Sequence, residues 1–553
     1  MTPRIRAASR ALDACVLALA LGTAAVLLRV LVSFEYGLDQ GIYAVVSEAV
    51  IEGGAPYRDA WDFKTPGVFF VYALARGLLG SGMHAVRGLE AAAFASLVAA
   101  FAILTRRFAG SASPGLLGGA LAVTGHVWLG FWHTGQPESF GGPLLAWALV
   151  LATFEPRPDA PQGRRVQWAG WAGAGALYAF AALLKPPLGG GIVVSWAIAA
   201  RWAWDHAPDG GRLRATLRPT LAFAAGALAP LAATALYLSV HGALPDLADA
   251  LFGFAPGYAA LNYRTGNLLI FWFRAIEFLL FRFSLLNVTG LALFFALPRL
   301  GAGERRLAVH VLGVTAFLVA GIALQGRFFA YHYGAALPLV ALLAGLGLWK
   351  LTRLERHRAF GGLGLGLLLV VLANANGLNG PVEGGLGTRL RAWDDGSRYN
   401  APRRRVAAWI ERHTAPGDAI YVWGFEPVLY DLADRRPASR YVYNAPQRAA
   451  WYQERGRDVL MEDLRGRPPE AIVVQRSDAH PGTTGNPRDS RAALRTFPAL
   501  TRLLAEEYSE TATVGDFTIH LRKPDREGAP QPAPGPPRDR ERSADRAGRG
   551  PGP

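Results

Sequence analysis

Residues 34–67 read FEYGLDQGIYAVVSEAVIEGGAPYRDAWDFKTPG and follow the first long apolar run of the chain. The stretch collects acidic and aromatic side chains and one of the chain's few lysines, namely Glu35, Asp39, Tyr43, Glu48, Glu52, Tyr57, Asp59, Trp61, Asp62 and Lys64. A plain connection between two membrane helices would not need such side chains. We therefore interpret this stretch as the front half of a functional site at a membrane surface.

The composition supports a membrane protein. Of the 553 residues, 51% are apolar and only 18% are charged, which is low for a soluble protein. The net charge is +15, but the basic residues form short clusters between apolar runs rather than one patch, which argues against a nucleic-acid partner. Cys15 is the single cysteine, so an intrachain disulfide or a zinc site built from cysteines is excluded.

The apolar runs predict about eleven membrane-spanning helices, because a span needs about 20 apolar residues. They lie near 11–33, 85–104, 113–131, 139–154, 168–184, 187–203, 219–240, 278–298, 307–325, 333–350 and 359–375. The first run has no clear signal-peptidase cleavage site and is interpreted as a retained signal anchor. The run 67–80 is too short to span and is expected to lie at the membrane interface.

Loop charge supports this topology. If Arg4, Arg6 and Arg10 place the N-terminus inside and 67–80 does not span, every basic cluster between spans falls on the cytoplasmic side. Counting 67–80 as a span would place all of these clusters outside. The outer segments are then 34–84, 132–138, 184–187, 241–277 and 326–332, together with everything after residue 376.

The chain changes character after residue 376. Residues 377–525 contain turn signals and four short β-rich runs, at 419–424, 439–443, 470–475 and 517–521, with helical patterns at 402–413 and 490–507. This alternation predicts a small extracytoplasmic α/β domain. Residues 526–553 are mostly Pro, Gly and charged residues and are predicted to be a disordered tail. The predicted fold is thus an α-helical polytopic membrane domain over 1–376, with an outer loop 34–84 that contains interfacial helices, followed by the α/β domain.

Two acids stand out on the outer side. Asp39 follows the first span, and Glu138 lies in HTGQPESF between two later spans, beside His133. Each acid could instead serve a helix N-terminus, where Asp is a good N-cap and a negative charge is favourable. Two carboxylates that reach one cavity from separate loops suit general-base catalysis and the orientation of an acceptor. Asp39, Glu138 and His133 also give a weak metal-binding signal, so a divalent metal stays an open alternative.

Cations lie on the same side. Lys185 precedes two prolines in LLKPPLGG, and Arg327 and His332 lie in QGRFFAYHYGAALP. Lysine and arginine could simply extend to the interface, but the positive-inside rule disfavours them on the outer side. With Lys64 they could hold a phosphate group at the membrane surface. The sequence contains no Walker A loop, no GxGxxG between a strand and a helix, and no serine-hydrolase elbow.

The order of these features resembles the GT-C superfamily of integral-membrane glycosyltransferases. The most similar branch is that of bacterial relatives of the dolichyl-phosphate-mannose protein mannosyltransferases and the lipid A aminoarabinose transferase, over roughly residues 10–375. The family's first acid corresponds to Asp39, its phosphate-contacting lysine to Lys64, its second acid to Glu138, and its R-Y-x-L-P-like element to Arg327–Pro338. Three departures bear on metal use and acceptor identity. Gln40 stands where the family often has Glu, Thr65 interrupts Lys-Pro-Pro, and the second acid is Glu138 rather than Asp.

The resemblance implies inverting transfer of a hexosyl or pentosyl group from a polyprenyl-phosphate donor to a protein, lipid or glycan acceptor, outside the bacterial inner membrane. Asp39 is expected to be the general base, and Glu138 to orient the acceptor. Lys64, Arg327, Lys185 and His332 are expected at the phosphate, and Tyr43, Tyr57, Trp61 and His133 at the sugar or acceptor. Alternatives are a transporter or flippase of lipid-linked sugars, or a non-catalytic subunit that binds lipid-linked glycan. The sequence shows no convincing internal repeat, which a transporter would tend to have.

Overall fold

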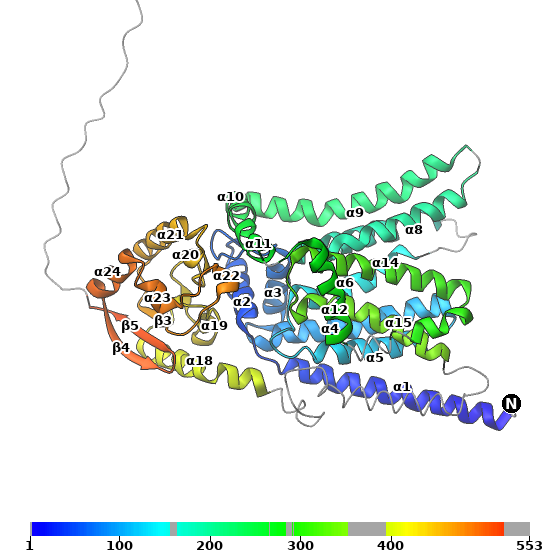
Figure 1. Cartoon of the computed structure of the whole chain (residues 1–553), viewed down its shortest axis with the longest axis horizontal. Helices are drawn as coiled ribbons and strands as arrows, with labels where there is room; N and C mark the ends of the chain where they lie inside the picture. The colour runs from blue at the N-terminus through cyan, green and yellow to red at the C-terminus, as the bar shows by residue number, and fades with distance from the viewer. Residues whose placement is uncertain are drawn as a thin grey trace, which may run out of the picture.

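The computed structural model describes residues 3–154, 163–208, 210–264, 266–283, 290, 292–351 and 394–524. A long helical bundle lies at one end of the molecule and a sheet-containing C-terminal unit at the other, with two short helices between them (Figure 1). The predicted span 359–375, the domain boundary near 376 and the tail 526–553 lie outside the described residues.

The bundle consists of apolar helices that run back and forth along the long axis of the molecule. They are α1 (Pro3–Val32), α4 (Met83–Ala109), α5 (Ser113–Val127), α6 (Pro137–Ala152), α7 (Gly163–Leu184), α8 (Ile192–Asp205), α9 (Arg212–Val240), α12 (Leu268–Arg282), α14 (Ala302–Gln325) and α15 (Ala336–Leu351). Glycines allow the closest crossings. A Cβ at Gly226 of α9 would lie 1.8 Å from the Ala172 carbonyl oxygen of α7, as expected where small residues let helix backbones approach.

Among the described helices, four are long and apolar enough to cross a membrane by length and composition: Asp13–Val32, Met83–Ala109, Arg212–Val240 and Ala302–Gln325. Other predicted spans correspond to shorter helices, such as α5 and α6. The predicted span 278–298 overlaps only the last turn of α12 (Leu268–Arg282), and residues 284–289 and 291 lie outside the described residues. The total of eleven spans therefore stays a prediction.

The two short helices between the bundle and the C-terminal unit are α2 (Leu38–Ile51) and α3 (Gly67–Leu79). At 13 residues α3 is too short to span a bilayer. Helix α2 begins at Leu38 with Gly37 as its N-cap, so Asp39 lies in the first turn and is not the N-cap.

The C-terminal unit contains a five-stranded sheet in the order β2-β1-β3-β5-β4. Strand β1 is parallel to β2 and β3, whereas β5 is antiparallel to β3 and β4. The elements are α18 (Asp394–His413), β1 (Ala419–Trp423), α19 (Val428–Ala433), β2 (Arg436–Pro437), α20 (Ala445–Arg448), α21 (Gln453–Gly466), β3 (Ala471–Gln475), α22 (Pro481–Thr484), α23 (Ser490–Leu494), α24 (Pro498–Glu507), β4 (Tyr508–Val514) and β5 (Phe517–Arg522).

The predicted strand 439–443 is wrong. After β2 the Ala438 N–H still bonds the carbonyl of Ile420, but the chain then leaves the sheet. The Arg440 carbonyl accepts a hydrogen bond from the Trp61 N–H at 2.7 Å, and Tyr441 packs edge-on against the Trp61 ring. The alternating aromatic pattern therefore reflects contacts with residues 34–67 rather than strand pairing. Strand β4 was missed because most of its side chains are polar and exposed.

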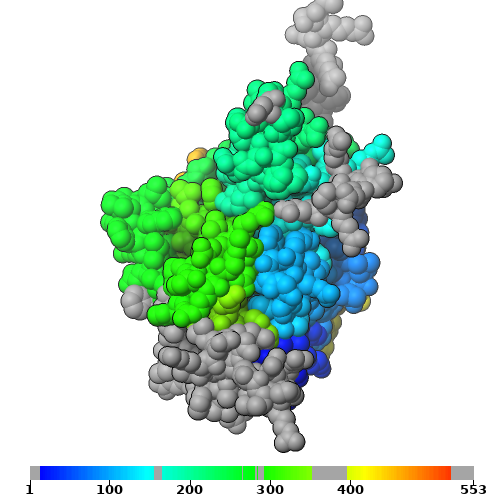
Figure 2. Space-filling view, turned by 90° about the vertical axis from the view of Figure 1, so that its right-hand side faces the viewer, coloured from blue at the N-terminus to red at the C-terminus, as the bar shows by residue number. Residues whose placement is uncertain are grey.

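The helix ends that carry basic clusters face away from the C-terminal unit. They include the ends of α4, α8 and α15 and the starts of α9 and α14. Figure 2 looks onto this end of the bundle, whose coloured surface is formed mainly by segments of the first 351 residues. Residues 34–37, 131–136 and 326–335 lie at the opposite helix ends, beside the C-terminal unit.

Candidate active site

Asp39 and Lys64 meet beside α2. The Lys64 Nζ atom lies 3.3 Å from Asp39 Oδ1 and 3.5 Å from Asp62 Oδ2. The Asp39 side chain is 25% exposed and that of Lys64 is 22% exposed, whereas Asp62 is fully buried. The nearness of Asp39 and Lys64 agrees with the sequence prediction. Asp62 is a buried partner of Lys64.

These charges change one another's proton affinity. Burial lowers the pKa of Lys64, but the carboxylates of Asp39 and Asp62 outweigh burial and the net pKa is raised. Burial raises the pKa of Asp62, and the Lys64 ammonium only partly offsets this effect. Lys64 therefore stays charged at neutral pH, and Asp62 holds its proton more tightly than an ordinary aspartate.

The turn before Lys64 is shaped by Tyr57. This residue has a φ of +72°, a conformation that is unusual for a bulky side chain. Its N–H bonds the Ala60 carbonyl at 2.7 Å and its hydroxyl donates to the Lys64 carbonyl at 2.8 Å. Tyr57 is fully buried and Trp61 is almost so. Both support the loop in this structure, and their predicted contact with sugar stays a prediction.

Tyr43 and Gln136 complete the surroundings of Asp39. The Gln136 Nε2 atom lies 3.4 Å from Asp39 Oδ2, and Gln136 Oε1 accepts a hydrogen bond from the Tyr43 hydroxyl at 3.1 Å. The Lys64 ammonium lies 5.0 Å from the Tyr43 ring centroid, a cation–π distance. Gln136 comes from the loop before α6, so it joins the Asp39 side of the site to the segment that carries Glu138.

Glu138 and Lys185 form a second pair. Lys185 lies at the break between α7 and the 3-10 helix η1 (Pro186–Gly191), as the prolines predicted, and its Nζ is 2.6 Å from Glu138 Oε1. The side chain of Glu138 is 1% exposed, and its Oε2 atom is buried without a hydrogen-bond partner among the described residues. Burial lowers the pKa of Lys185, and the attraction of Glu138 only partly restores it. Glu138 is in the first turn of α6, but its ion pair shows that it does more than favour the helix N-terminus.

Tyr331 lies beside Lys185 of the second pair. It belongs to the 3-10 helix η4 (Ala330–Tyr333), and its ring centroid lies 5.5 Å from Lys185 Nζ. Burial raises the pKa of Tyr331, and the negative charges of Asp39 and Glu138 raise it further. Gln136, two residues before Glu138, also reaches Asp39. The acids that were predicted from separate loops thus lie in one region, and their shared role in one site stays a prediction.

Arg327 and His332 lie at the edge of this site. The Arg327 guanidinium is 4.1 Å from the Tyr258 ring centroid, and its Nε donates to Asn262 Oδ1 at 2.6 Å. A second nitrogen of Arg327 donates to the Gly482 carbonyl of the C-terminal unit. The His332 Nδ1 atom lies 2.9 Å from the Arg327 carbonyl oxygen. Burial, followed by the charge of Lys185, lowers the pKa of His332 well below its usual value, so this imidazole is neutral.

The C-terminal unit reaches into the site. The Tyr443 hydroxyl donates to Asp62 Oδ1 at 2.8 Å across 381 positions of sequence. Helix α19 packs on α2 so closely that a Cβ at Gly41 would lie 2.8 Å from the Val428 nitrogen. Sequence reasoning gave the C-terminal unit no site residue, because no local pattern around Tyr443 points to Asp62.

The predicted metal ligands do not form a cluster. His133 lies near Tyr331, with ring centroids 5.9 Å apart, whereas Asp39 and Glu138 are each paired with a lysine. Among the described residues, no group of three or more His, Cys, Asp or Glu side chains is arranged to hold a metal ion. The part of the chain that the structure describes therefore holds no preformed three-ligand metal site.

Solved structures of ArnT have a similar fold. ArnT from Cupriavidus metallidurans bound to undecaprenyl phosphate matches with a TM-score of 0.57 and 13% identity, over 93% of this chain and 99% of ArnT. The apo form of ArnT gives the same TM-score and identity, over 91% and 97%. The oligosaccharyltransferase AglB from Archaeoglobus fulgidus, in complex with an inhibitory peptide and a dolichol-phosphate, gives only 0.43 at 14% identity, over 91% and 74%. No protein-family model and no curated protein matches the chain.

The likeness to ArnT defines the fold. ArnT is the lipid A aminoarabinose transferase, a GT-C glycosyltransferase. This chain has the same fold, and the resemblance that its sequence predicted is confirmed at that level.

Proposed function

We propose that this protein transfers a sugar from a polyprenyl-phosphate donor to a hydroxyl group of an acceptor at the outer surface of a cytoplasmic membrane. The observation that carries the proposal is Asp39, an accessible carboxylate 3.3 Å from the ammonium of Lys64. A second acid and a second lysine lie in the same site, within the influence of one tyrosine. The fold shared with ArnT, which was crystallised with undecaprenyl phosphate, supports the same reaction class.

The proposed chemistry follows from these positions. Asp39 accepts the proton of the acceptor hydroxyl, and the resulting oxygen nucleophile attacks the anomeric carbon. The bond from that carbon to the phosphate oxygen breaks on the opposite face, so the configuration inverts and the polyprenyl phosphate leaves with the electron pair. Lys64 and Arg327 stabilise the negative charge that grows on this phosphate, an effect that is often the largest in catalysis. Glu138, fixed by Lys185, orients the acceptor.

The arrangement of charge supports the proposed membrane topology. The basic clusters lie at helix ends away from the C-terminal unit, and the positive-inside rule places such ends in the cytoplasm. The site and the C-terminal unit would then lie on the outer side of the membrane. Labelling of cysteines introduced by Arg201→Cys and Arg467→Cys into a Cys15→Ser background tests this orientation, with only the second expected to react from outside.

Transfer in vitro tests the function directly. Purified protein is incubated with a synthetic polyprenyl-phosphate sugar and candidate hydroxyl acceptors, and product is detected by mass spectrometry. Asp39→Asn should lower kcat by about 10²- to 10⁴-fold, since a general base is lost, while donor binding survives. Asp205→Asn is the control, because Asp205 is exposed and paired with Arg201 at the far end of the bundle.

The outcome separates the alternatives. Full activity in Asp39→Asn would show that Asp39 is not the base. A protein that moves the lipid-linked sugar across vesicles without forming product would be a flippase. One that only binds the lipid-linked sugar would be a non-catalytic subunit.

A further inference from the structure

Arg87, near the start of α4, is completely hydrogen-bonded inside the molecule. Its guanidinium has five N–H donors and makes five hydrogen bonds, to the Phe34, Glu35 and Phe131 carbonyls, Thr134 Oγ1 and Glu90 Oε2, at 2.9 to 3.3 Å. Residues 34 and 35 lead directly into the segment that carries Asp39, and residues 131 and 134 lead to Glu138. One buried side chain therefore ties together the two segments that carry the acids.

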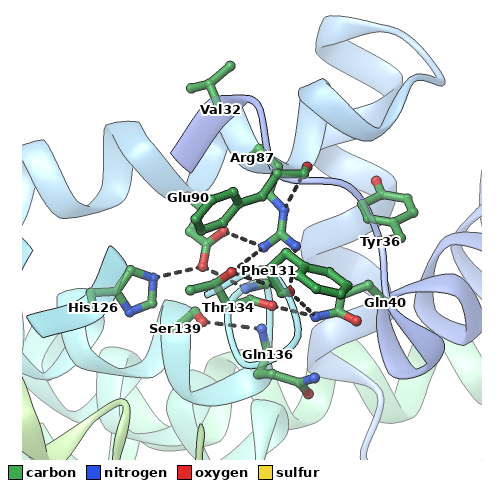
Figure 3. Close-up of polar contacts among 12 residues, drawn as sticks. Val32, Tyr36, Gln40, Arg87, Glu90, His126, Phe131, Thr134, Gln136 and Ser139 are labelled. Atoms are coloured by element: carbon green, nitrogen blue, oxygen red, sulfur yellow. Dashed lines mark hydrogen bonds and ion pairs between the residues drawn. The ribbon is translucent and has the colours of Figure 1, made fainter. Parts of the chain in front are cut away.

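Glu90 fixes Arg87 and the same loop from the other side. Its Oε1 atom accepts a hydrogen bond from the Gly135 N–H at 2.6 Å and lies 2.9 Å from His126 Nε2. The His126 ring stacks on Phe94 with centroids 3.9 Å apart. Figure 3 shows Arg87, Glu90 and His126 converging on the loop that contains Phe131 and Thr134.

Gln40 supplies the third connection. Its Nε2 atom lies 3.1, 3.2 and 2.6 Å from the carbonyl oxygens of Phe131, Trp132 and Thr134, and its Oε1 accepts from the Gly37 N–H at 3.1 Å. Gln40 directly follows Asp39, so the backbone of Asp39 is held to this loop. The loop ends in Gln136, whose amide reaches Asp39 Oδ2.

These groups take no part in the chemistry proposed above. Arg87 and Glu90 are fully buried, and Gln40 is almost so. A buried ion pair often adds little stability over apolar side chains of the same volume, because both charges lose their hydration. The ion pair here fixes the relative position of the two segments, because each of its donors and acceptors bonds to one defined position on them.

We propose that Arg87, Glu90 and Gln40 form a brace that sets the position of Asp39 relative to Glu138 during sugar transfer. They are positioning residues, and this inference rests on the proposed function. Displacement of a catalytic group by about 1 Å can cost about 10²-fold in rate, so the brace acts on kcat more than on donor binding.

Gln40→Glu is the sharpest test, because it barely changes size and turns a donor into an acceptor that faces three carbonyl oxygens. We expect kcat to fall by about 10²-fold with the donor KM nearly unchanged. Activity should recover partly as the pH is lowered, because the introduced carboxyl regains a proton that it can donate. Gln453→Glu, at the start of α21 away from the brace, is the matched control and should keep the wild-type rate and pH profile.

Two further variants keep the test informative if Gln40→Glu folds poorly. Thr134→Val removes one acceptor of Arg87 without changing volume, and Arg87→Lys keeps the charge but cannot reach five acceptors. Both should lower kcat, Thr134→Val less, in protein whose thermal unfolding resembles that of the wild type. Wild-type kcat and pH profile in these folded variants would overturn the brace alone. Absence of transfer by the wild-type protein would overturn the proposed function and the brace with it.

Discussion

The two lysine–carboxylate pairs of the site look alike in sequence but differ in structure. Lys64 lies between Asp39 and Asp62, and the two carboxylates raise its pKa. Lys185 has only Glu138 within ion-pair distance among the described residues, and burial keeps its pKa low. Asp39 is a quarter exposed, whereas Glu138 is almost completely buried.

From this difference we infer different tasks for the two pairs. An acid that must exchange a proton with an incoming hydroxyl needs access to it, and Asp39 has that access. Within the described part of the chain, one buried oxygen of Glu138 has no hydrogen-bond partner, which suits a hydrogen bond from a bound acceptor. We therefore expect the first pair to govern chemistry and the second to govern orientation and stability.

Breaking the first pair should have the largest effect. Lys64→Gln removes the cation that would stabilise the leaving phosphate and leaves Asp39 and Asp62 facing each other. We expect kcat/KM to fall by about 10²- to 10³-fold, with weaker binding of a polyprenyl phosphate by fluorescence titration. Lys523→Gln, an exposed lysine at the end of the C-terminal unit, should behave like the wild type. Retention of full activity in Lys64→Gln would contradict the assigned role.

Breaking the second pair should affect stability more than chemistry. Lys185→Gln leaves the Glu138 carboxylate buried without its cation, which should cost about 3 kcal/mol of unfolding free energy. The double variant Glu138→Gln/Lys185→Gln should recover part of this loss, while kcat falls about tenfold through poorer orientation of the acceptor. Thermal unfolding of the four proteins of this cycle measures the coupling. Additive effects in the cycle would mean that the pair does not act as a unit.

Asp62→Asn should have the smallest effect and a defined pH dependence. Because the folded-state pKa of Asp62 is raised, the folded protein binds this proton more tightly than the unfolded chain does. Asp62 therefore makes the wild type lose stability as the pH rises through the usual aspartate pKa toward the raised value. Relative to the wild type, the Tm of Asp62→Asn should therefore be higher at pH 7 than at pH 4, by a few degrees. A difference that stays constant with pH would contradict the shift.

Much of the fold could be predicted because it depends on local patterns. Apolar runs mark the helices of the bundle, and three of the four predicted β-rich runs are strands. The nearness of Asp39 to Lys64 followed from their sequence distance and common side of the membrane, and the helix break at Lys185 followed from its prolines. These features depend on residues that are neighbours in the chain or on the parity of the spans.

The rest depends on contacts between distant segments. The burial of Asp62 could not be predicted from nearby residues, because Asp62 contacts Tyr443, which is 381 positions away, as well as Lys64. Gln40 was noted only as a departure from the usual Asp-Glu, since nothing local shows its three carbonyl partners in the loop 131–134. The aromatic pattern at 439–443 was misread as a strand for the same reason.

The hydrogen bond from Tyr443 to Asp62 has a consequence for protein engineering. A chimera that joins this bundle to the C-terminal unit of another chain would also exchange the residue that holds Asp62 against Lys64. The transfer rate of the chimera would then depend on how well the two parts contact each other, and not only on the catalytic residues of the bundle. In a domain swap, residues 58–64 and 438–444 should therefore come from the same parent protein.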